Sequence, residues 1–514
     1  MKRPVQEWER MLAGKPPLKN GFTSELEHKV RERIYMQKEA RKAPYRAMAA
    51  LMSLVMLLGC GWWFRDDVKE LLKPDTGVNI PTALQGDPLG DKEYHLKIHQ
   101  FEQMGNFEYT IRRPFIIRHP SVQLTMADAP FEYNNDPDKF KAWMDKEQPD
   151  ILQLPMSLYT ELAAEGRLKP LDTLVRESKF DLDTLHAPLV EMLRQLAGGT
   201  GELYGLAADF GTMGLYVNED LFAKYGVPLP DGELSADEIL QLAKRFQGTD
   251  AGGLGVFDRG NKFSLIQLLG QASGLQLVAG DAEDGLKATV DSDAWKTIWR
   301  DVAAGLQEGW VTQGKPVDYG KNGITMKELG KQDPFAKGEV AMAIAPSYYY
   351  TNLETFGQEG VMTANWSTMP IRIDSSATNQ ELFMGTNTVY AINAASTQTE
   401  ADWAMLSFIV SGAWMKGLDN PLWNSVLMAD RSVMNQAASK HWKAFYEADV
   451  DPVIAAGSYR TAADKQMSKA NALVYSLGGE EMEAVVKNGV SVDEAVEAFQ
   501  TKLSAQLAGL KGGE

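Results

Sequence analysis

The chain has 514 residues, of which 44% are hydrophobic and 24% are charged. This is ordinary globular composition, with enough length for two or three domains. The 52 lysines and arginines are outnumbered by 69 aspartates and glutamates, so the net charge is −17. Such a charge argues against a nucleic-acid-binding protein, because neutralising phosphates requires a basic surface. A single cysteine, Cys60, excludes an intrachain disulfide, and six histidines leave little material for a histidine-rich metal site.

The N-terminal segment, residues 1–46, is basic although the whole chain is acidic. It contains 12 lysines and arginines against six acidic residues, a net charge of +6, so the remainder carries −23. A capping box at Ser24 and Glu27, followed by apolar side chains at i, i+4 spacing, predicts a short amphipathic helix here. Such a helix would lie on anionic lipid or contact a partner. The alternative is a solvated basic segment leading to a membrane.

Residues 47–64 (AMAALMSLVMLLGCGWWF) carry no charge and predict a transmembrane or signal-anchor helix. As a helix they would span about 27 Å, close to the roughly 30 Å of a bilayer core. Basic residues cluster only on the N-terminal side, so the positive-inside rule places residues 1–46 in the cytoplasm and everything after Phe64 outside. The one-sided basic flank disfavours the alternative of a buried core helix.

The sequence Leu57-Leu58-Gly59-Cys60 supports a second interpretation, because it resembles the lipobox of bacterial lipoproteins. Cys60 would then be lipidated and become the mature N-terminus. Against this, Leu58 stands where a smaller residue is usual, and the preceding segment is longer than in a normal signal peptide. Both interpretations stay open, and both place the bulk of the chain on the extracellular side. Residues 65–93 then form a linker, rich in proline, glycine and aspartate from residue 74 onward.

Strand-like and helix-like segments alternate from residue 94 onward, which predicts sheets covered by helices. The predicted strands are residues 94–101, 122–126, 150–154, 214–217, 340–345 and 388–393. The predicted helices are residues 140–146, 158–165, 219–225, 235–246, 402–411 and 492–506. The glycine-rich residues 252–255 lack the lysine of a phosphate-binding loop, and we predict a turn there.

Motifs of catalysis are missing from the sequence. There is no G-x-S-x-G, no H-E-x-x-H, no P-loop, and no G-x-G-x-x-G after a predicted strand. The acidic residues at 136–138 and 281–284 do not fit an EF-hand loop and are better explained as solvated turns. We therefore predict that the protein is not an enzyme and uses no metal or cofactor.

Aromatic residues are better placed for binding. Tyr348, Tyr349 and Tyr350 follow the predicted strand 340–345, and Trp366 lies in a later loop. Ligands of open α/β proteins bind at the carboxyl ends of strands, and flat aromatic faces suit the apolar faces of sugar rings. The alternative is that these rings pack in the core or between lobes.

Four stretches of the sequence resemble the family 1 extracellular solute-binding proteins of bacterial ABC importers, the maltose-binding-protein group. They are PDILQL at 149–154 with LAAEGRLKPLD at 162–172, YGLA at 204–207 with GLYVNEDLF at 214–222 and YGVP at 225–228, FAKGEVAM at 335–342, and VSVDEAV at 490–496. Their order and spacing agree with the family across about residues 94–510.

The resemblance implies an α/β fold of the type II periplasmic-binding-protein kind. Two lobes, each a helix-covered mixed sheet, would be joined by crossing segments and would close on a ligand in the cleft between them. Lobe one would comprise residues 94–207 and about 367–415, and lobe two residues 209–365 and about 416–510. Ala207–Phe210 would form part of the hinge.

Carried over motif by motif, the resemblance places seven residues in the cleft: Pro155, Ser157, Asp209, Phe210, Tyr348, Tyr349 and Trp366. The chain departs from the family pattern at three positions. Ser347-Tyr348 stands where sugar-binding members often have a tryptophan, Ala207-Ala208-Asp209 replaces a proline-containing turn, and some members carry an aspartate at the position of Ser157. These departures leave the identity of the ligand open.

Together these features predict a membrane-tethered extracellular receptor that binds an oligosaccharide or a related polar solute. By lobe closure it would deliver this solute to the permease subunits of an ABC transporter. The alternative is a ligand-sensing or scaffold protein that signals through its N-terminal segment, because an importer receptor does not need 46 cytoplasmic residues. A carbohydrate-active enzyme is disfavoured, and no nucleic-acid partner is expected.

Overall fold

The computed structural model describes residues 87–510, except 88, 91, 101–106, 200, 281–284, 322, 378–379, 381, 413, 415–426 and 435. The predicted basic segment 1–46, the apolar span 47–64 with Cys60, and most of the linker 65–93 lie outside the described residues. Among the residues described, no helix is long and apolar enough to cross a membrane. All of them belong to one compact unit, Gln85–Glu514.

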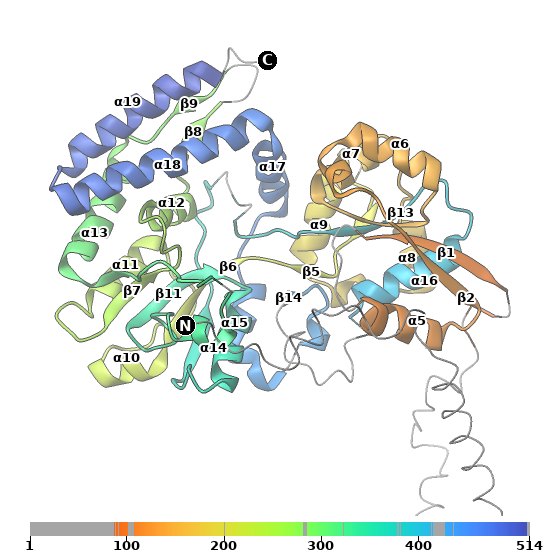
Figure 1. Ribbon diagram of the computed structural model, residues 1–514, viewed down its shortest axis with the longest axis horizontal. Coiled ribbons are helices and arrows are strands. Elements are labelled where there is room, and N and C mark those ends of the chain that lie inside the picture. The colour runs from red at the N-terminus through yellow and green to blue at the C-terminus, as the bar shows by residue number, and fades with distance from the viewer. Residues whose placement is uncertain are drawn as a thin grey trace, which may run out of the picture. The chain divides into compact units, whose positions relative to one another are not determined.

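Lobe one is built on a five-stranded mixed sheet with the order β2-β1-β3-β13-β4. Figure 1 labels β1, β2 and β13 of this sheet. β1 is parallel to β2 and β3, whereas β13 runs antiparallel to β3 and β4. The strands are β1 (Tyr94–His99), β2 (Val122–Ala127), β3 (Ile151–Leu154), β4 (Gly205–Leu206) and β13 (Val389–Ile392). The helices of this lobe are α5 (Arg113–Arg118), α6 (Pro137–Glu147), α7 (Met156–Ala164), α8 (Asp172–Ser178), α9 (Ala187–Leu196) and α16 (Thr399–Val410).

Lobe two repeats this plan with the order β10-β7-β11-β6-β12. β7 is parallel to β10 and β11, whereas β6 is antiparallel to β11 and β12. The strands are β6 (Met213–Asn218), β7 (Gly252–Val256), β10 (Val311–Gln313), β11 (Val340–Pro346) and β12 (Trp366–Met369). The helices are α10 (Glu219–Tyr225), α11 (Ala236–Lys244), α12 (Phe263–Ala272), α13 (Asp293–Glu308), α14 (Met326–Gly330), α15 (Tyr349–Gln358), α17 (Pro452–Ala463), α18 (Lys465–Asn488) and α19 (Val492–Leu510). The two mixed, helix-covered sheets agree with the predicted fold.

Residues 252–255, predicted as a turn, form the buried strand β7 instead. The prediction was wrong because these glycines serve close packing within the sheet and against α11. A Cβ atom on Gly253 would lie 2.0 Å from the carbonyl oxygen of Ala243 in α11, and one on Gly252 would lie 2.2 Å from the hydroxyl of Thr312. Only glycine permits the helix and the strand to approach so closely.

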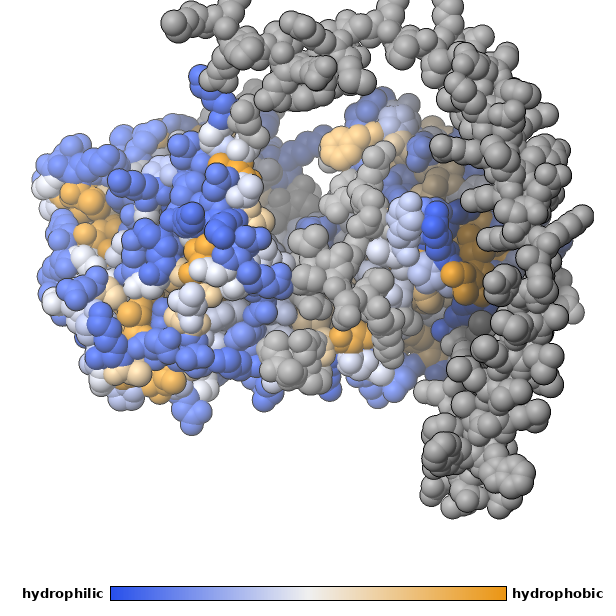
Figure 2. Space-filling model, turned by 60° about the horizontal axis from the view of Figure 1, so that its bottom comes forward, coloured by the Kyte–Doolittle hydropathy of each residue, from blue (hydrophilic) through white to orange (hydrophobic). Residues whose placement is uncertain are grey.

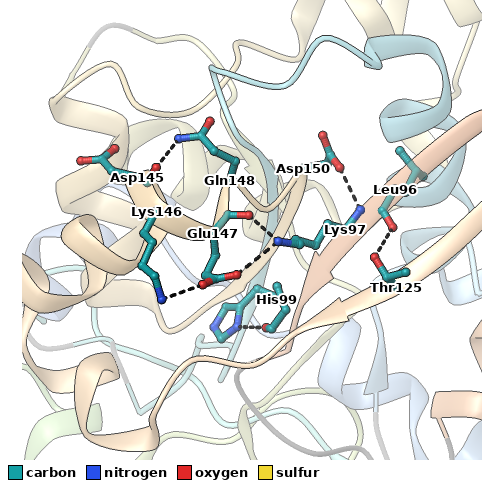
Figure 3. Close-up of polar contacts among 10 residues, drawn as sticks. Leu96, Lys97, His99, Thr125, Asp145, Lys146, Glu147, Gln148 and Asp150 are labelled. Carbon is teal, nitrogen blue, oxygen red and sulfur yellow. Dashed lines mark hydrogen bonds and ion pairs between the residues drawn. The ribbon is translucent and has the colours of Figure 1, made fainter.

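In lobe one, Lys97 ties β1 to the chain between α6 and β3 (Figure 3). Its backbone N–H donates to the Asp150 carboxylate at 2.8 Å, and its ammonium group donates to the Glu147 carbonyl at 2.6 Å. Two residues further on, the His99 ring packs between Phe140 and Trp143 at the carboxyl end of β1. Burial lowers the pKa of His99 to about 4, so its ring is neutral at pH 7. These contacts fix the carboxyl end of β1, and ligands of open α/β folds bind at the carboxyl ends of strands.

The return from lobe two to lobe one lies later in the chain than the resemblance implied. β12 pairs with β6 and therefore belongs to lobe two, and the Leu234–Ile371 bridge keeps the following residues there as well. The chain crosses back at residues 380–388, just before β13. No local sequence pattern marked this boundary, because β12 belongs to lobe two only through its pairing with β6, which lies far away in the sequence.

Hydrophilic side chains cover most of the described surface in the view of Figure 2, with hydrophobic groups in small patches. The apolar material is inside, where the two sheets and their helices meet. Fully buried rings include Tyr94, Phe115, Phe140 and Tyr159 in lobe one and Tyr216, Phe263, Trp295 and Trp299 in lobe two.

Candidate functional site

Within the described residues, segments from three passages of the chain between the lobes hydrogen-bond to one another. In the first crossing, β5 (Asp209–Phe210) pairs antiparallel with β14 (Leu427–Met428) of the third. In the next step along the first crossing, Gly211 exchanges hydrogen bonds of 2.7 and 3.1 Å with Gly385 of the second. The Thr212 hydroxyl adds a bond of 2.7 Å to the Phe383 carbonyl. A small ladder of this kind can bend at its ends while the packing of each lobe is kept.

Aromatic rings fill the space beside the first crossing. Phe210 is buried, and its ring stacks on His186 with centroids 4.5 Å apart and planes inclined by 17°. Tyr446 packs edge-on against both rings. Burial lowers the pKa of His186 to about 4, and the charge of Arg431 contributes in the same direction. Phe210, which the resemblance placed in the cleft, is in this conformation buried in the packing of the hinge region.

Helix α17 connects the lobes a second time. It packs on α9 of lobe one, where the Arg460 guanidinium donates to the Gln195 carbonyl at 3.0 Å. The Ser458 hydroxyl accepts a bond of 2.9 Å from the backbone N–H of Gln380, so α17 is also fixed to the second crossing. A closing movement would therefore carry α17 along with this crossing.

A pocket of about 210 Å³ opens where β7 and β11 end, beside the second crossing. Most of its wall is apolar, and three polar side chains, Asp258, Ser264 and Gln267, also line it. The remaining lining residues are Met213, Val256, Phe257, Leu265, Leu268, Ile344 and Leu382. This is the edge of the sheet at which ligands of open α/β folds bind.

Tyr348 is exposed and adjoins this pocket through its contact with the lining residue Phe257. It precedes α15 and is 57% exposed, and its ring meets Phe257 of the pocket edge-on with centroids 6.2 Å apart. The structure thus brings Tyr348, one of the predicted site residues, together with a pocket residue that the sequence did not single out. An exposed phenol beside an apolar pocket is an arrangement that can stack on a sugar ring.

Tyr349 is buried, with 2% of its surface exposed, and its hydroxyl donates a 2.6 Å hydrogen bond to the Asp333 carboxylate. Asp333 in turn pairs with the guanidinium of Arg259 at 3.0 Å. Burial raises the pKa of Tyr349 well above its usual range, and the Asp333 charge adds to this effect. Tyr349 and Asp333 hold Arg259, which directly follows the pocket residue Asp258, so in this conformation Tyr349 is a buried supporting residue.

Trp366 also packs inside lobe two. It is 5% exposed, and its indole stacks on the ring of His441 with centroids 3.8 Å apart and planes inclined by 8°. On its other side it meets Tyr216 and Tyr350. In this conformation its faces are occupied by protein rings.

The lobe-one candidates lie at the carboxyl end of β3. Pro155 is the N-terminal cap of α7 and is half-buried, and Ser157 is exposed in the first turn of that helix. Asp209 lies in the first crossing, where it is paired with Met428 in the antiparallel β5–β14 ladder. These three residues are thus spread over lobe one and the hinge, while Tyr348 and the pocket belong to lobe two.

Phe257 and Asp258 are the residues that reasoning from the sequence missed. They follow β7 directly, so the rule that ligands bind at carboxyl ends of strands would have selected them if residues 252–255 had been recognised as a strand. For metals, the described part of the chain holds no group of three or more His, Cys, Asp or Glu residues that could bind an ion. Asp136, one of the acidic residues considered for calcium, caps α6 by accepting a hydrogen bond from the Lys139 backbone.

The chain belongs to the bacterial extracellular solute-binding protein family, whose model matches residues 138–416. The family consists of binding proteins that face the outside of the cell. The sequence matches no curated protein.

Several solved structures have the same fold, and each match covers nearly the whole length of the solved chain. An extracellular solute-binding protein family 1 from Alicyclobacillus acidocaldarius is 14% identical, with a TM-score of 0.59, and the match covers 81% of this chain and 98% of that one. A sugar transporter from Rhizobium etli in an open conformation is 17% identical, with a TM-score of 0.52 and coverage of 80% and 99%. The sugar-binding protein MalE from Xanthomonas citri is 17% identical, with a TM-score of 0.50 and coverage of 81% and 98%.

Proposed function

We propose that this protein is a membrane-tethered extracellular receptor that binds an oligosaccharide between its lobes and delivers it to an ABC permease. The observation that carries the proposal is the position of Tyr348, exposed beside the pocket at the end of β7 and β11. In this arrangement a flat aromatic face lies next to an apolar wall that also holds a carboxylate, a hydroxyl and an amide.

A sugar ring fits this chemistry. Its C–H face can lie on the Tyr348 phenol, while hydroxyls meet polar groups such as Asp258 and Gln267. The pocket is smaller than the roughly 300–1,000 Å³ of typical ligand sites, so we infer that it holds one end of the ligand. Lobe one, with Pro155 and Ser157, would cover the remainder on closure. Two of the structures with the same fold are described as sugar proteins, which supports this ligand class.

Closure would use the ladder formed by the three crossings. Binding can favour the closed form only through contacts that the open form lacks. Asp209, in the first crossing, is our candidate for such a contact, since a hydroxyl of the ligand would reach its carboxylate when the lobes approach. We infer no catalytic step, no cofactor and no metal.

The ligand class can be tested on residues 85–514, which form the compact unit. Isothermal titration with neutral oligosaccharides of two to six units, with free amino acids and short peptides as controls, should give saturable binding only with sugars. Each hit is then repeated with Tyr348→Ala. Binding of an amino acid or peptide, with every sugar inactive, would contradict the proposal.

The tether is proposed from residues 47–64, with the N-terminus inside and the lobes outside. Protease added to intact protoplasts should then degrade the lobes and leave a tag at the N-terminus protected. A degraded tag would contradict this orientation. Lipidation of Cys60 would instead appear as a mature chain that begins at this residue.

The net basic segment of 46 residues before the span favours a second candidate function, in which the protein reports ligand binding inward. Deleting residues 1–40 separates the two. Sugar uptake should survive the deletion if the protein is an importer receptor, whereas a signalling role would be lost.

A further inference from the structure

One face of the first helical segment in lobe one carries large apolar side chains into solvent. The segment consists of the π-helical turn η2 (Glu108–Arg112) and α5, which follows it directly. Tyr109 is 62% exposed and Ile117 is 70% exposed, and Arg113 lies midway between them, also exposed. The spacing of four residues places all three on one side, while Ile111 and Phe115 on the other side are buried in the core.

The segment that carries this face is net basic, although the chain after residue 46 is strongly acidic. The segment from Phe107 to His119 contains three arginines and one glutamate. The Arg113 guanidinium lies 4.4 Å from the centre of the Tyr109 ring and also pairs with Glu108. Exposed aromatic and aliphatic side chains that alternate with arginine are typical of a helix lying at the surface of an anionic bilayer.

The polypeptide enters lobe one beside this same helix. The carboxylate of Asp87 accepts a hydrogen bond of 2.6 Å from the Ser121 hydroxyl and lies 2.9 Å from Nδ1 of His119. Both partners follow immediately after α5, and both His119 and Asp87 have buried side chains. The point where the N-terminal part of the chain joins the lobe is therefore fixed at the end of α5.

We propose that the face formed by Tyr109, Arg113 and Ile117 rests on the anionic lipid surface of the membrane that holds the tether. This inference depends on the membrane tether at residues 47–64 proposed above. Residues 65–86, which the sequence predicts to be a linker, separate this span from Asp87, and a random chain of this length would have a root-mean-square reach of about 25 Å. The lobe is thus held at a high local concentration over the bilayer, where even a weak surface contact is populated. The contact would orient lobe one and leave lobe two free to move.

The experiment uses the full chain in lipid vesicles. Because Cys60 is the only cysteine, Ile117→Cys in a Cys60→Ala background can carry a single fluorescent label. Tyr319→Cys, at a 63% exposed residue of lobe two, is the matched control. Nitroxide-bearing lipids quench a label that touches the bilayer. Vesicles that contain phosphatidylglycerol are compared with vesicles of phosphatidylcholine alone, and Arg113→Glu is added to the variant labelled at position 117.

We expect quenching at position 117 to exceed that at position 319 several-fold in the anionic vesicles. It should fall in phosphatidylcholine and in the Arg113→Glu variant. Equal quenching at the two positions, in protein that floats with the vesicles, would overturn the contact. Unlabelled protein that retains Cys60 and does not float would overturn the tether and the contact with it. Sugar binding by residues 85–514 is measured without any membrane, so failure of the proposed binding function would be seen separately.

Discussion

The imidazole ring of His186 lies flat on the phenyl ring of Phe210, with centroids 4.5 Å apart. The backbone N–H of His186 also donates a 2.8 Å hydrogen bond to the Ala429 carbonyl. Phe210 belongs to the first crossing, and Ala429 follows β14 in the third. His186, the N-terminal cap of α9 in lobe one, thus contacts both the first and the third crossing. A hinge movement depends on these crossings.

This position makes the stability of the protein depend on pH. Burial lowers the pKa of His186 from 6.5 to about 4, so the unfolded chain takes up a proton at this residue before the folded chain does. The stability that the neutral ring provides is complete above about pH 6.5 and is lost as the pH falls toward 4, roughly 3 kcal/mol in all. His186→Phe keeps a flat ring on Phe210 and removes the titration. Urea unfolding at pH 7.0, 5.5 and 4.5 should show a smaller loss of stability for this variant than for the wild type.

His99 has the same lowered pKa and is unchanged in this variant, so part of the pH dependence should remain. His99→Phe is therefore a matched control, because His99 is buried inside lobe one, whereas His186 packs against the crossing segments. Equal loss of stability in the wild type and in His186→Phe would contradict the assignment of a buried, neutral ring at the hinge.

The neighbouring tyrosines 348 and 349 should behave differently. Tyr348→Ala removes an exposed ring, so oligosaccharide binding should weaken by about 1–3 kcal/mol, while the free energy of unfolding changes by about 0.5 kcal/mol or less. Tyr349→Phe keeps the buried ring and removes the hydrogen bond to Asp333. It should lower the stability by about 1–3 kcal/mol. Titration calorimetry and urea unfolding of both variants test this division, and a Tyr348→Ala protein with wild-type affinity would rule out its stacking role.

The close approach of α11 to β7 should tolerate no side chain at Gly253. Gly253→Ala would place a methyl group 2.0 Å from the Ala243 carbonyl oxygen, and we expect a loss of about 1–3 kcal/mol or more. Gly457→Ala is the matched control, because this glycine lies within α17 and nothing stands within 4 Å of an added Cβ. That change should be neutral or stabilising by up to about 1 kcal/mol. Equal melting temperatures for the two variants would contradict the packing described here.

Local sequence patterns were sufficient to predict helices where periodicity and capping act together. Glu219–Tyr225 is helical as predicted, and the capping box of Ser235 and Glu238 forms at the start of α11. The apolar run at 150–154 becomes β3, parallel to β1 as a buried strand of this kind should be. The family motifs then gave the two-lobed arrangement that local patterns cannot supply.

The failures have a common physical origin in contacts between distant segments. Residues 252–255 form a strand because α11 and the side chain of Thr312 need space that only glycine leaves. The second crossing lies after β12 because β12 pairs with β6, about 150 residues earlier in the chain. Likewise, residues 348–350 are all tyrosines, and only the three-dimensional packing leaves Tyr348 exposed while it buries the next two. No spacing rule in a single sequence separates these cases.

The central claim is that the lobes close around an oligosaccharide, and small-angle scattering of residues 85–514 tests it most directly. The radius of gyration should fall when an oligosaccharide identified by calorimetry is added to saturation. Asp209→Ala should bind this sugar more weakly and lose part of the compaction at saturation, because the proposed contact at the first crossing would form only in the closed state. A radius of gyration that stays unchanged while a sugar binds tightly would contradict the account and leave a rigid binding module.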